Sequence, residues 1–245
     1  MFERQEHDLT GQELRRLFLH GVDMRGGAIY DARLRGVDLW DIDIQGDLKN
    51  IRVNGVDIIP LIEAELNRRD PDRAKMRPVD AGGFRQAWRI LEARWAVTVE
   101  RARALPEQRL HECVDDEWSF IQTLRHLCFA TDAWVVRMVL GDPSPWHPLD
   151  LPWDEAPGWD GVPWDRDARP SLNEVLAVRA ERQGVVRGEL AELTDQQLAS
   201  TVTRTEPGWP QAEDLAVEHC LRIVLNEEWQ HRDFAERDLA GLAKG

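Results

Sequence analysis

The amino-acid sequence predicts a mainly α-helical protein in which a short repeat segment precedes a four-helix bundle. Apolar residues return at every fifth position from residue 9 to residue 44, and from Asp80 onward they follow the period of about 3.6 residues that marks an amphipathic helix. The chain has 245 residues, enough for one or two domains with a sizeable core. We divide it into the repeat segment (1–60), a short helix with a linker (61–78) and the bundle (79–245).

The repeat segment has a period that neither regular secondary structure can keep on one face. Its central positions are all apolar: Leu9, Leu14, Leu19, Met24, Ile29, Leu34, Leu39 and Ile44. A second, mostly small position precedes each of the later ones by two residues: Leu17, Val22, Gly27, Ala32, Val37 and Ile42. The pattern resembles pentapeptide-repeat proteins, and the resemblance implies a square, right-handed β-solenoid with the central residues inside. Two coils at most fit, so we expect a cap that docks on the other domain.

A short helix follows the repeats, and four long helices follow the linker. Pro60 opens the short helix at residues 61–68, and Asp70-Pro71 ends it. The patterns Ser119 with Gln122 and Ser171 with Glu174 are capping boxes that start two of the long helices. We expect the first long helix to begin at residue 80, and the other three to span residues 119–141, 171–193 and 212–239. Four long amphipathic helices are typical of a four-helix bundle.

The segment between the second and third long helices, residues 141–170, is rich in proline and tryptophan. It holds seven of the chain's thirteen prolines and four of its eleven tryptophans. Loops of this length are uncommon in compact domains and are often functional. Two interpretations stay open, a loop fastened to the bundle by its tryptophans and a lid over a site.

The last long helix carries two polar residues on an apolar face. The face consists of Val217, Cys220, Val224, Glu227, His231 and Phe234. An unpaired carboxylate there would cost several kcal/mol, so Glu227 must be neutral, hydrogen-bonded, paired or bound to a cation. His126, about two turns into the second long helix, is the candidate third member of a metal site. The alternative is a buried Glu–His pair without a metal.

These residues resemble the DinB-like superfamily of metal-binding four-helix bundles. The resemblance rests on Trp118-Ser119, on Thr123–Leu127, and on a helix about a hundred residues later with ligands four positions apart. It covers roughly residues 80–241 and implies one metal ligand from the second helix and two from the fourth. Glu227, where many members have histidine, is similar to the mycothiol-dependent maleylpyruvate isomerase branch, whose zinc site is His, Glu, His. Gln122 departs from the family, which often has glutamate there.

The predicted site is therefore His126, Glu227 and His231 around a divalent metal. Two imidazoles and a carboxylate suit Zn²⁺ with an open position, and they would also suit Ni, Fe or Mn. The resemblance implies a thiol S-transferase or thiol-assisted isomerase that activates a low-molecular-weight, mycothiol-like thiol as a metal-bound thiolate. A hydrolase that uses a metal-bound water is the enzymatic alternative.

Four further residues are weaker candidates. Glu228 is a rival ligand, or it hydrogen-bonds a ligand imidazole, or it is solvated. Arg179 and Gln183 interrupt the apolar stripe of the third helix, where they either contact substrate or, for the arginine, pair with a buried acid. Trp146 of the long loop is a candidate substrate contact.

Composition limits the partners and the location. With 45 acidic against 31 basic residues, the formal net charge is −14, which disfavours nucleic acid and anionic membranes. There is no apolar run of about 20 residues and no signal-peptide core at the N-terminus, so we expect a cytoplasmic protein. The three cysteines lack CxxC spacing, and we expect them to be reduced.

A non-catalytic interaction protein is the alternative from another functional class. In this interpretation the repeat segment addresses a partner. Residues 1–60 hold eleven acids and eight bases, a balance too even for a mimic of nucleic acid. Docking or formation of a homodimer is therefore the favoured use of the segment.

Overall fold

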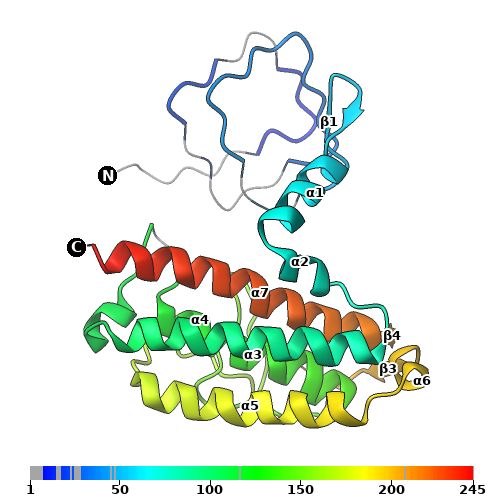
Figure 1. Cartoon of the computed structure of the whole chain (residues 1–245), viewed down its shortest axis with the longest axis vertical. Coiled ribbons are helices and arrows are strands. Elements are labelled where there is room, and N and C mark those ends of the chain that lie inside the picture. Colours follow the sequence, from blue (N-terminus) through cyan, green and yellow to red (C-terminus); the bar gives the residue numbers. More distant parts are fainter. Residues whose placement is uncertain are drawn as a thin grey trace. The chain divides into compact units, whose positions relative to one another are not determined.

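The computed structural model describes residues 8–14, 18–22, 24, 29–44, 46, 48–115, 117–206 and 208–244. The chain divides into two compact units, Met1–Leu48 and Lys49–Gly245 (Figure 1). Among the residues described, no helix has both the length and the apolar character needed to cross a membrane.

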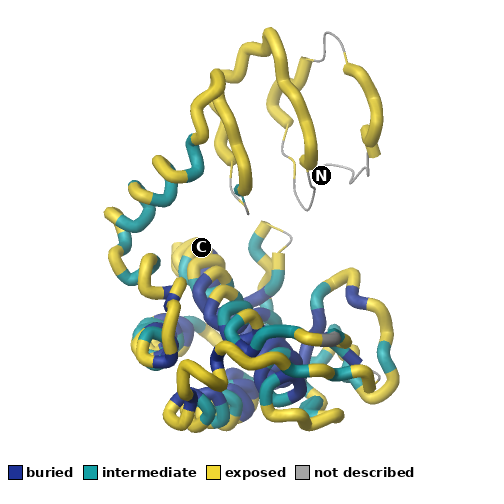
Figure 2. The backbone as a smooth tube through the Cα atoms, turned by 90° about the vertical axis from the view of Figure 1, so that its right-hand side faces the viewer, coloured by how far each residue is buried: buried dark blue, intermediate teal, exposed yellow. Residues whose placement is uncertain are grey.

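The first unit keeps the period of five in its backbone but not as a packed core. Residues with positive φ recur at intervals of five or ten: Gly11, Gly21, Asp31, Gly36, Asp41 and Gly46. The eight central apolar residues are between 47% and 73% exposed. The described part of the unit is coloured almost entirely as exposed in Figure 2. None of its described residues lies in a helix or strand. The described part therefore does not show the β-solenoid that the resemblance implied, because a solenoid buries these side chains.

The second unit begins with a small hairpin and two short helices. Their bounds are β1 (Arg52–Val53), β2 (Val56–Asp57), α1 (Ile59–Arg69) and α2 (Pro71–Lys75). The α2 helix occupies part of the segment for which the sequence indicated a linker. Its N-cap, Asp70, accepts a hydrogen bond from the backbone N–H of Asp72. The Asp70 carboxylate also pairs with Arg94 at 2.7 Å, which ties the short helices to the bundle.

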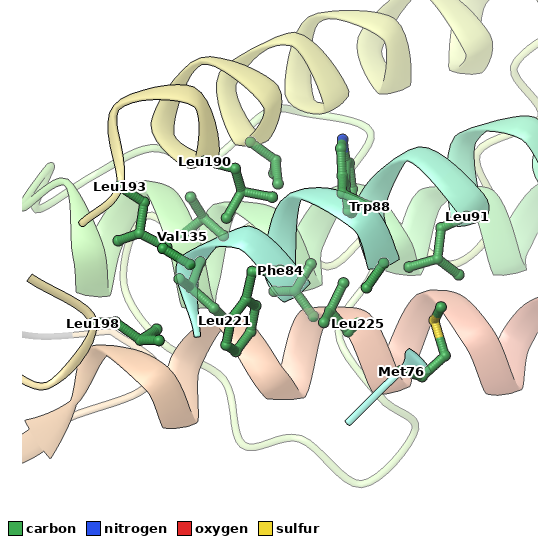
Figure 3. Packing of buried hydrophobic residues seen from close by; sticks show 14 of the residues in the cluster. Met76, Phe84, Trp88, Leu91, Val135, Leu190, Leu193, Leu198, Leu221 and Leu225 are labelled. Carbon is green, nitrogen blue, oxygen red and sulfur yellow. The ribbon is translucent and has the colours of Figure 1, made fainter. Parts of the chain in front are cut away.

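The bundle confirms the prediction of a mainly α-helical fold. Its helices are α3 (Ala81–Arg103), α4 (Phe120–Thr131) with the π-helix η2 (Asp132–Val139), α5 (Leu172–Glu192) and α7 (Val217–Leu242). Both α3 and α4 pack against α5 and against α7, so the four helices form a bundle (Figure 1) that encloses two clusters of buried apolar residues. Phe84, Trp88 and Leu91 of α3 are at most 2% exposed, and they lie among leucines of α5 and α7 (Figure 3).

The start signals of the helices were predicted well in two cases and wrongly in one. Both capping boxes, at Ser119 and at Ser171, are formed. The fourth long helix starts at Val217 rather than at residue 212, because β4 (Ala212–Ala216) pairs with β3 (Thr201–Arg204) as an antiparallel hairpin. The remaining short elements are the 3₁₀ helix η1 (Glu107–His111) and α6 (Asp195–Leu198).

The loop at residues 141–170 is fastened to the bundle by a buried arginine. Arg125 of α4 is fully buried, and it donates hydrogen bonds to the carbonyls of Leu149 (2.7 Å), Asp165 (2.5 Å) and Ala168 (3.4 Å). The tryptophans of the loop add apolar contacts; the ring centroid of Trp153 lies 5.3 Å from that of Trp209. Hydrogen bonds from the bundle thus hold three carbonyls of the loop.

Replacing Arg125 by methionine should destabilise the protein by about 2 to 3 kcal/mol, because three loop carbonyls would lose their buried donor. Urea unfolding measures the loss. The matched control is Arg89→Met, since Arg89 is an exposed arginine on α3. Equal unfolding midpoints for the two variants would contradict the role of Arg125.

Candidate metal centre

The structure brings together the three residues that the sequence singled out. His126 lies on α4, and Glu227 and His231 lie one turn apart on α7. The Glu227 Oε2 atom is 3.1 Å from His231 Nε2 and 3.4 Å from His126 Nε2. One ligand atom from each residue can be chosen so that all three lie within 4.8 Å of one another, which is close enough to hold a metal ion.

A backbone carbonyl sets the orientation of the His126 ring. His126 Nδ1 lies 2.9 Å from the carbonyl oxygen of Leu151, in the long loop. A carbonyl only accepts hydrogen bonds, so Nδ1 carries the proton and donates it. The lone pair of the neutral ring is then on Nε2, the nitrogen that faces Glu227. Metal-binding histidines usually have this arrangement.

Glu227 carries the negative charge of the centre, and the two imidazoles face it. Burial alone would raise the pKa of Glu227, but hydrogen bonds with His126 and His231 outweigh it and hold the pKa at about 2. The carboxylate is therefore ionised and faces two imidazole nitrogens. A neutral imidazole whose lone pair faced the carboxylate would repel it, so each facing nitrogen must either carry a proton or share a metal ion with the carboxylate. Two imidazoles and one carboxylate fit a divalent metal and leave a position open.

Aromatic rings cover the centre. The Trp118 ring is stacked on His231, with centroids 5.7 Å apart and an angle of 10°, and its centroid lies 4.5 Å from that of His126. Phe129 and Phe234 complete the shell, with centroids 6.1 Å from His126 and 6.0 Å from His231. These rings place apolar surface beside the three side chains, which strengthens their electrostatic interactions.

A pocket of about 250 Å³ reaches the centre at His231. It is lined by Glu117, Trp118, Thr123, Asp154, His231, Phe234 and Asp238. Three of the residues are acids and none is lysine or arginine. Arg237, which is not one of the lining residues, pairs with Glu117 at 2.6 Å and with Asp238 at 2.7 Å, and Arg166 pairs with Asp154. The described lining therefore offers a small molecule carboxylate oxygens and two aromatic faces.

The weaker candidates lie away from this pocket. Glu228 and Arg179 form a buried ion pair, with 2.8 Å between Glu228 Oε2 and Arg179 Nη2 and side chains only 2% and 4% exposed. The Arg179 guanidinium also lies over the ring of Trp95, 5.1 Å from its centroid. Of the two roles considered for Arg179, the structure shows the pairing with a buried acid. Gln183 is half-buried, and Trp146 stacks on Phe129, with centroids 5.6 Å apart.

Sequence reasoning missed the contacts that complete the centre. Leu151 acts through its carbonyl, which every residue has, so no sequence signal marks it. The indole of Trp118 donates a hydrogen bond to Asp154 at 2.9 Å across 36 positions of the chain. The position of Trp118 directly before the N-cap Ser119 was a usable signal, because it places the ring at the mouth of the bundle.

The comparisons with known proteins place the bundle in a family. The model of the DinB superfamily matches residues 90–235, which is more than half of the chain and includes all three residues of the centre. The search of curated proteins and the search of solved structures each found no match. On the evidence of this match, together with the closed bundle and the His–Glu–His centre, the chain belongs to the DinB superfamily.

Proposed function

We propose that this protein is a metal-dependent thiol transferase or thiol-assisted isomerase. The observation that carries the proposal is the convergence of His126, Glu227 and His231 beside a pocket. The donor set favours Zn²⁺, and Ni, Fe or Mn would also fit it. A bound divalent metal with an open position would lower the pKa of a thiol so that it reacts as a thiolate.

The buried cysteines of the protein are poor nucleophiles, which supports a reactive thiol supplied by a small molecule. Burial raises the pKa of Cys128 far above its ordinary value and that of Cys220 to about 11, so both stay protonated and unreactive. Neither lines the pocket. A small-molecule thiol, mycothiol-like by the resemblance of the Glu227 ligand pattern, is therefore the proposed nucleophile.

The protein residues have separate roles in this proposal. Glu227 supplies the one negative charge of the centre, and the two imidazoles would direct their lone pairs toward the metal ion. The hydrogen bond to Leu151 keeps His126 in the required tautomer. Trp118 and Phe234 form the apolar walls along which a thiol and its electrophile would lie without water.

The charge of the pocket bears on the electrophile. Glu117, Asp154 and Asp238 line it and would repel carboxylates, while their partners Arg237 and Arg166 are not among the lining residues. A neutral or cationic electrophile is therefore favoured over a dicarboxylate.

The first unit enters the proposal as a docking or dimerisation segment of the pentapeptide-repeat type. The support is the recurrence of positive-φ residues at intervals of five or ten, and the exposed apolar residues between them. A unit of this kind would add a contact surface to the enzyme.

Substituting His126 or His231 by alanine should remove the metal, because two ligands cannot hold a divalent ion in an open site. Elemental analysis should find about one metal ion per wild-type chain and almost none in either variant. The exposed His20 provides the control, since His20→Ala should keep its metal. Full occupancy in the His126 and His231 variants would refute the ligand assignment.

The wild-type protein should consume one thiol from a panel when it is offered a generic neutral electrophile. His126→Ala should lower kcat/KM by at least about 100-fold, since removing even an outer partner of a metal ligand costs 10- to 100-fold. Loss of free thiol measures the reaction. Turnover without any thiol would indicate the hydrolase instead. If the purified protein contained no metal and showed no turnover, the result would favour the non-catalytic interaction protein.

Glu117→Gln should raise kcat/KM for an anionic electrophile by about two- to fivefold relative to a neutral analogue. The variant removes an exposed charge at the pocket and leaves Arg237 less neutralised, an effect of about 0.5 to 1 kcal/mol. Added salt should reduce the difference. Glu100→Gln, an exposed substitution on α3, should change neither rate. An unchanged ratio of the two rates in Glu117→Gln would contradict the electrostatic selection.

A further inference from the structure

Part of the long loop runs along α4 at the level of the metal centre. We call residues 147–151 the strap. The Leu149 carbonyl accepts a hydrogen bond from Arg125 Nε at 2.7 Å, and the Leu151 carbonyl accepts one from His126 Nδ1 at 2.9 Å. Two consecutive residues of the helix thus contact two carbonyls of the strap. The orientation of the His126 ring therefore depends on where the strap lies.

The carboxyl group of Asp150 closes the strap into a turn. Asp150 is fully buried, and its Oδ2 accepts a hydrogen bond from the backbone N–H of His147 at 2.9 Å. In return, the Asp150 N–H donates to the His147 carbonyl at 2.9 Å. The Leu149 N–H donates to His147 Nδ1 at 3.1 Å.

The same carboxyl group contacts a second buried acid, Asp132, at the start of the π-helix η2. Both side chains are fully buried, and no donor among the described residues reaches the Asp150 Oδ1 atom. The two carboxyl groups lie close enough to interact, and a hydrogen bond between them would give that atom its missing partner. Two carboxyl groups can share a hydrogen bond only when one of them is protonated. Arg182 of α5 selects the ionised partner, because its Nη2 donates to Asp132 Oδ2 at 2.8 Å and its Nε lies 2.6 Å from Asp132 Oδ1. Asp150 is therefore the protonated member.

The surrounding charges agree with this assignment. Burial, and then the charge of Asp132, raise the pKa of Asp150 well above its ordinary value. Burial also raises the pKa of Asp132, but Arg182 opposes the rise.

The other groups that bear on the pair come from two elements: Arg125 and Cys128 of α4, and Asp142 and His147 of the loop. Burial holds Cys128 and His147 in their neutral forms, by raising the pKa of the thiol and lowering that of the imidazole. Arg125 is bound by three carbonyls. The charge of Asp132 is thus balanced by Arg182 while Asp150 is neutral.

We propose that Asp150 is a positioning residue for the metal centre: its hydrogen bond to Asp132 holds the strap on α4, so that the Leu151 carbonyl fixes the His126 ring. The inference rests on the proposed function only in treating His126 as a metal ligand. Asp150 touches neither the metal site nor the pocket, and it acts through the backbone of the strap.

Hydrogen exchange of the strap amides in the full-length, metal-free protein tests whether Asp150 holds the strap on α4. The closed strap keeps the Asp150 proton, whereas an opened strap releases it above its ordinary pKa of 3.8. Opening should therefore become easier as the pH rises, by up to about tenfold per pH unit after correction for intrinsic exchange, until the closed form also ionises. In Asp150→Asn the amide N–H₂ can donate to Asp132 without titrating. That variant should stay protected and lose the pH dependence, while Asp150→Ala should lose protection at every pH.

Zinc affinity, measured by competition with a chromophoric chelator, tests the positioning. Asp150→Ala should bind zinc about 10- to 100-fold more weakly, the usual effect of losing an outer partner of a metal ligand. Asp150→Asn should stay close to the wild type. Asp160→Asn, an exposed substitution in the same loop, is the matched control and should change neither measurement.

Two results would overturn the proposal. The first is that the strap amides of the wild type exchange with no pH dependence beyond the intrinsic rate, and that they are as well protected in Asp150→Ala as in the wild type. The other is an unchanged zinc affinity in Asp150→Ala despite a loosened strap, because Asp150 would then hold the loop without positioning His126. Neither measurement uses turnover, so an absence of thiol chemistry would leave both results standing.

Discussion

The negative charge of Glu227, a partly buried side chain, is the constraint on which the geometry of the centre depends. The carboxylate lies between two imidazole nitrogens, under the ring of Trp118, and its charge has to be balanced there. Two ligands one turn apart on α7 satisfy the geometry of a single helix, but the third must come from a neighbouring helix. The packing of α4 against α7 supplies it. The functional centre therefore depends on the same helix contact that closes the core.

Other buried charges in the bundle follow the same rule with different partners. Glu228, the neighbour of Glu227 in sequence, faces the other way and is balanced by Arg179. Arg125 and Arg137 are both fully buried, and backbone carbonyls of the loops accept hydrogen bonds from them. An arginine held by carbonyls joins a loop to a helix more firmly than apolar contact alone, because removing either side leaves buried polar atoms without partners. These arginines explain how a proline-rich segment can form a fixed wall beside the centre.

The sequence predicted those features that depend on local patterns. The capping boxes at Ser119 and Ser171 placed two helix starts, because such a box is formed within four residues. Glu227 and His231 were recognised because they break a periodic apolar face. His126 could be joined to them only through the resemblance to a known superfamily, since spacing within one helix cannot show which residue of another helix lies opposite.

The features that the sequence did not predict depend on contacts between distant residues. The start of α7 was misjudged because residues 212–216 pair with β3, and that pairing overrides a composition suited to a helix. The hydrogen bond from His126 to Leu151 leaves no mark in the sequence, because a backbone carbonyl is the acceptor. The proton shared by Asp132 and Asp150 is equally hidden. Each aspartate alone is an ordinary polar residue, and only the fold buries them together.

The acids that line the pocket and the buried Asp150 lie in different environments, and this difference gives them different roles. The carboxylates of the pocket are paired with Arg166 and Arg237 near solvent, and in the proposed function their charge selects among substrates. Asp150 forms no ion pair within the described part of the chain and is fully buried, so it keeps its proton and contributes a directed hydrogen bond. A charged group in the place of Asp150 would be expelled from the core, whereas a neutral hydrogen-bond donor can remain there. The strap can therefore lie against α4 without adding a second negative charge beside Asp132.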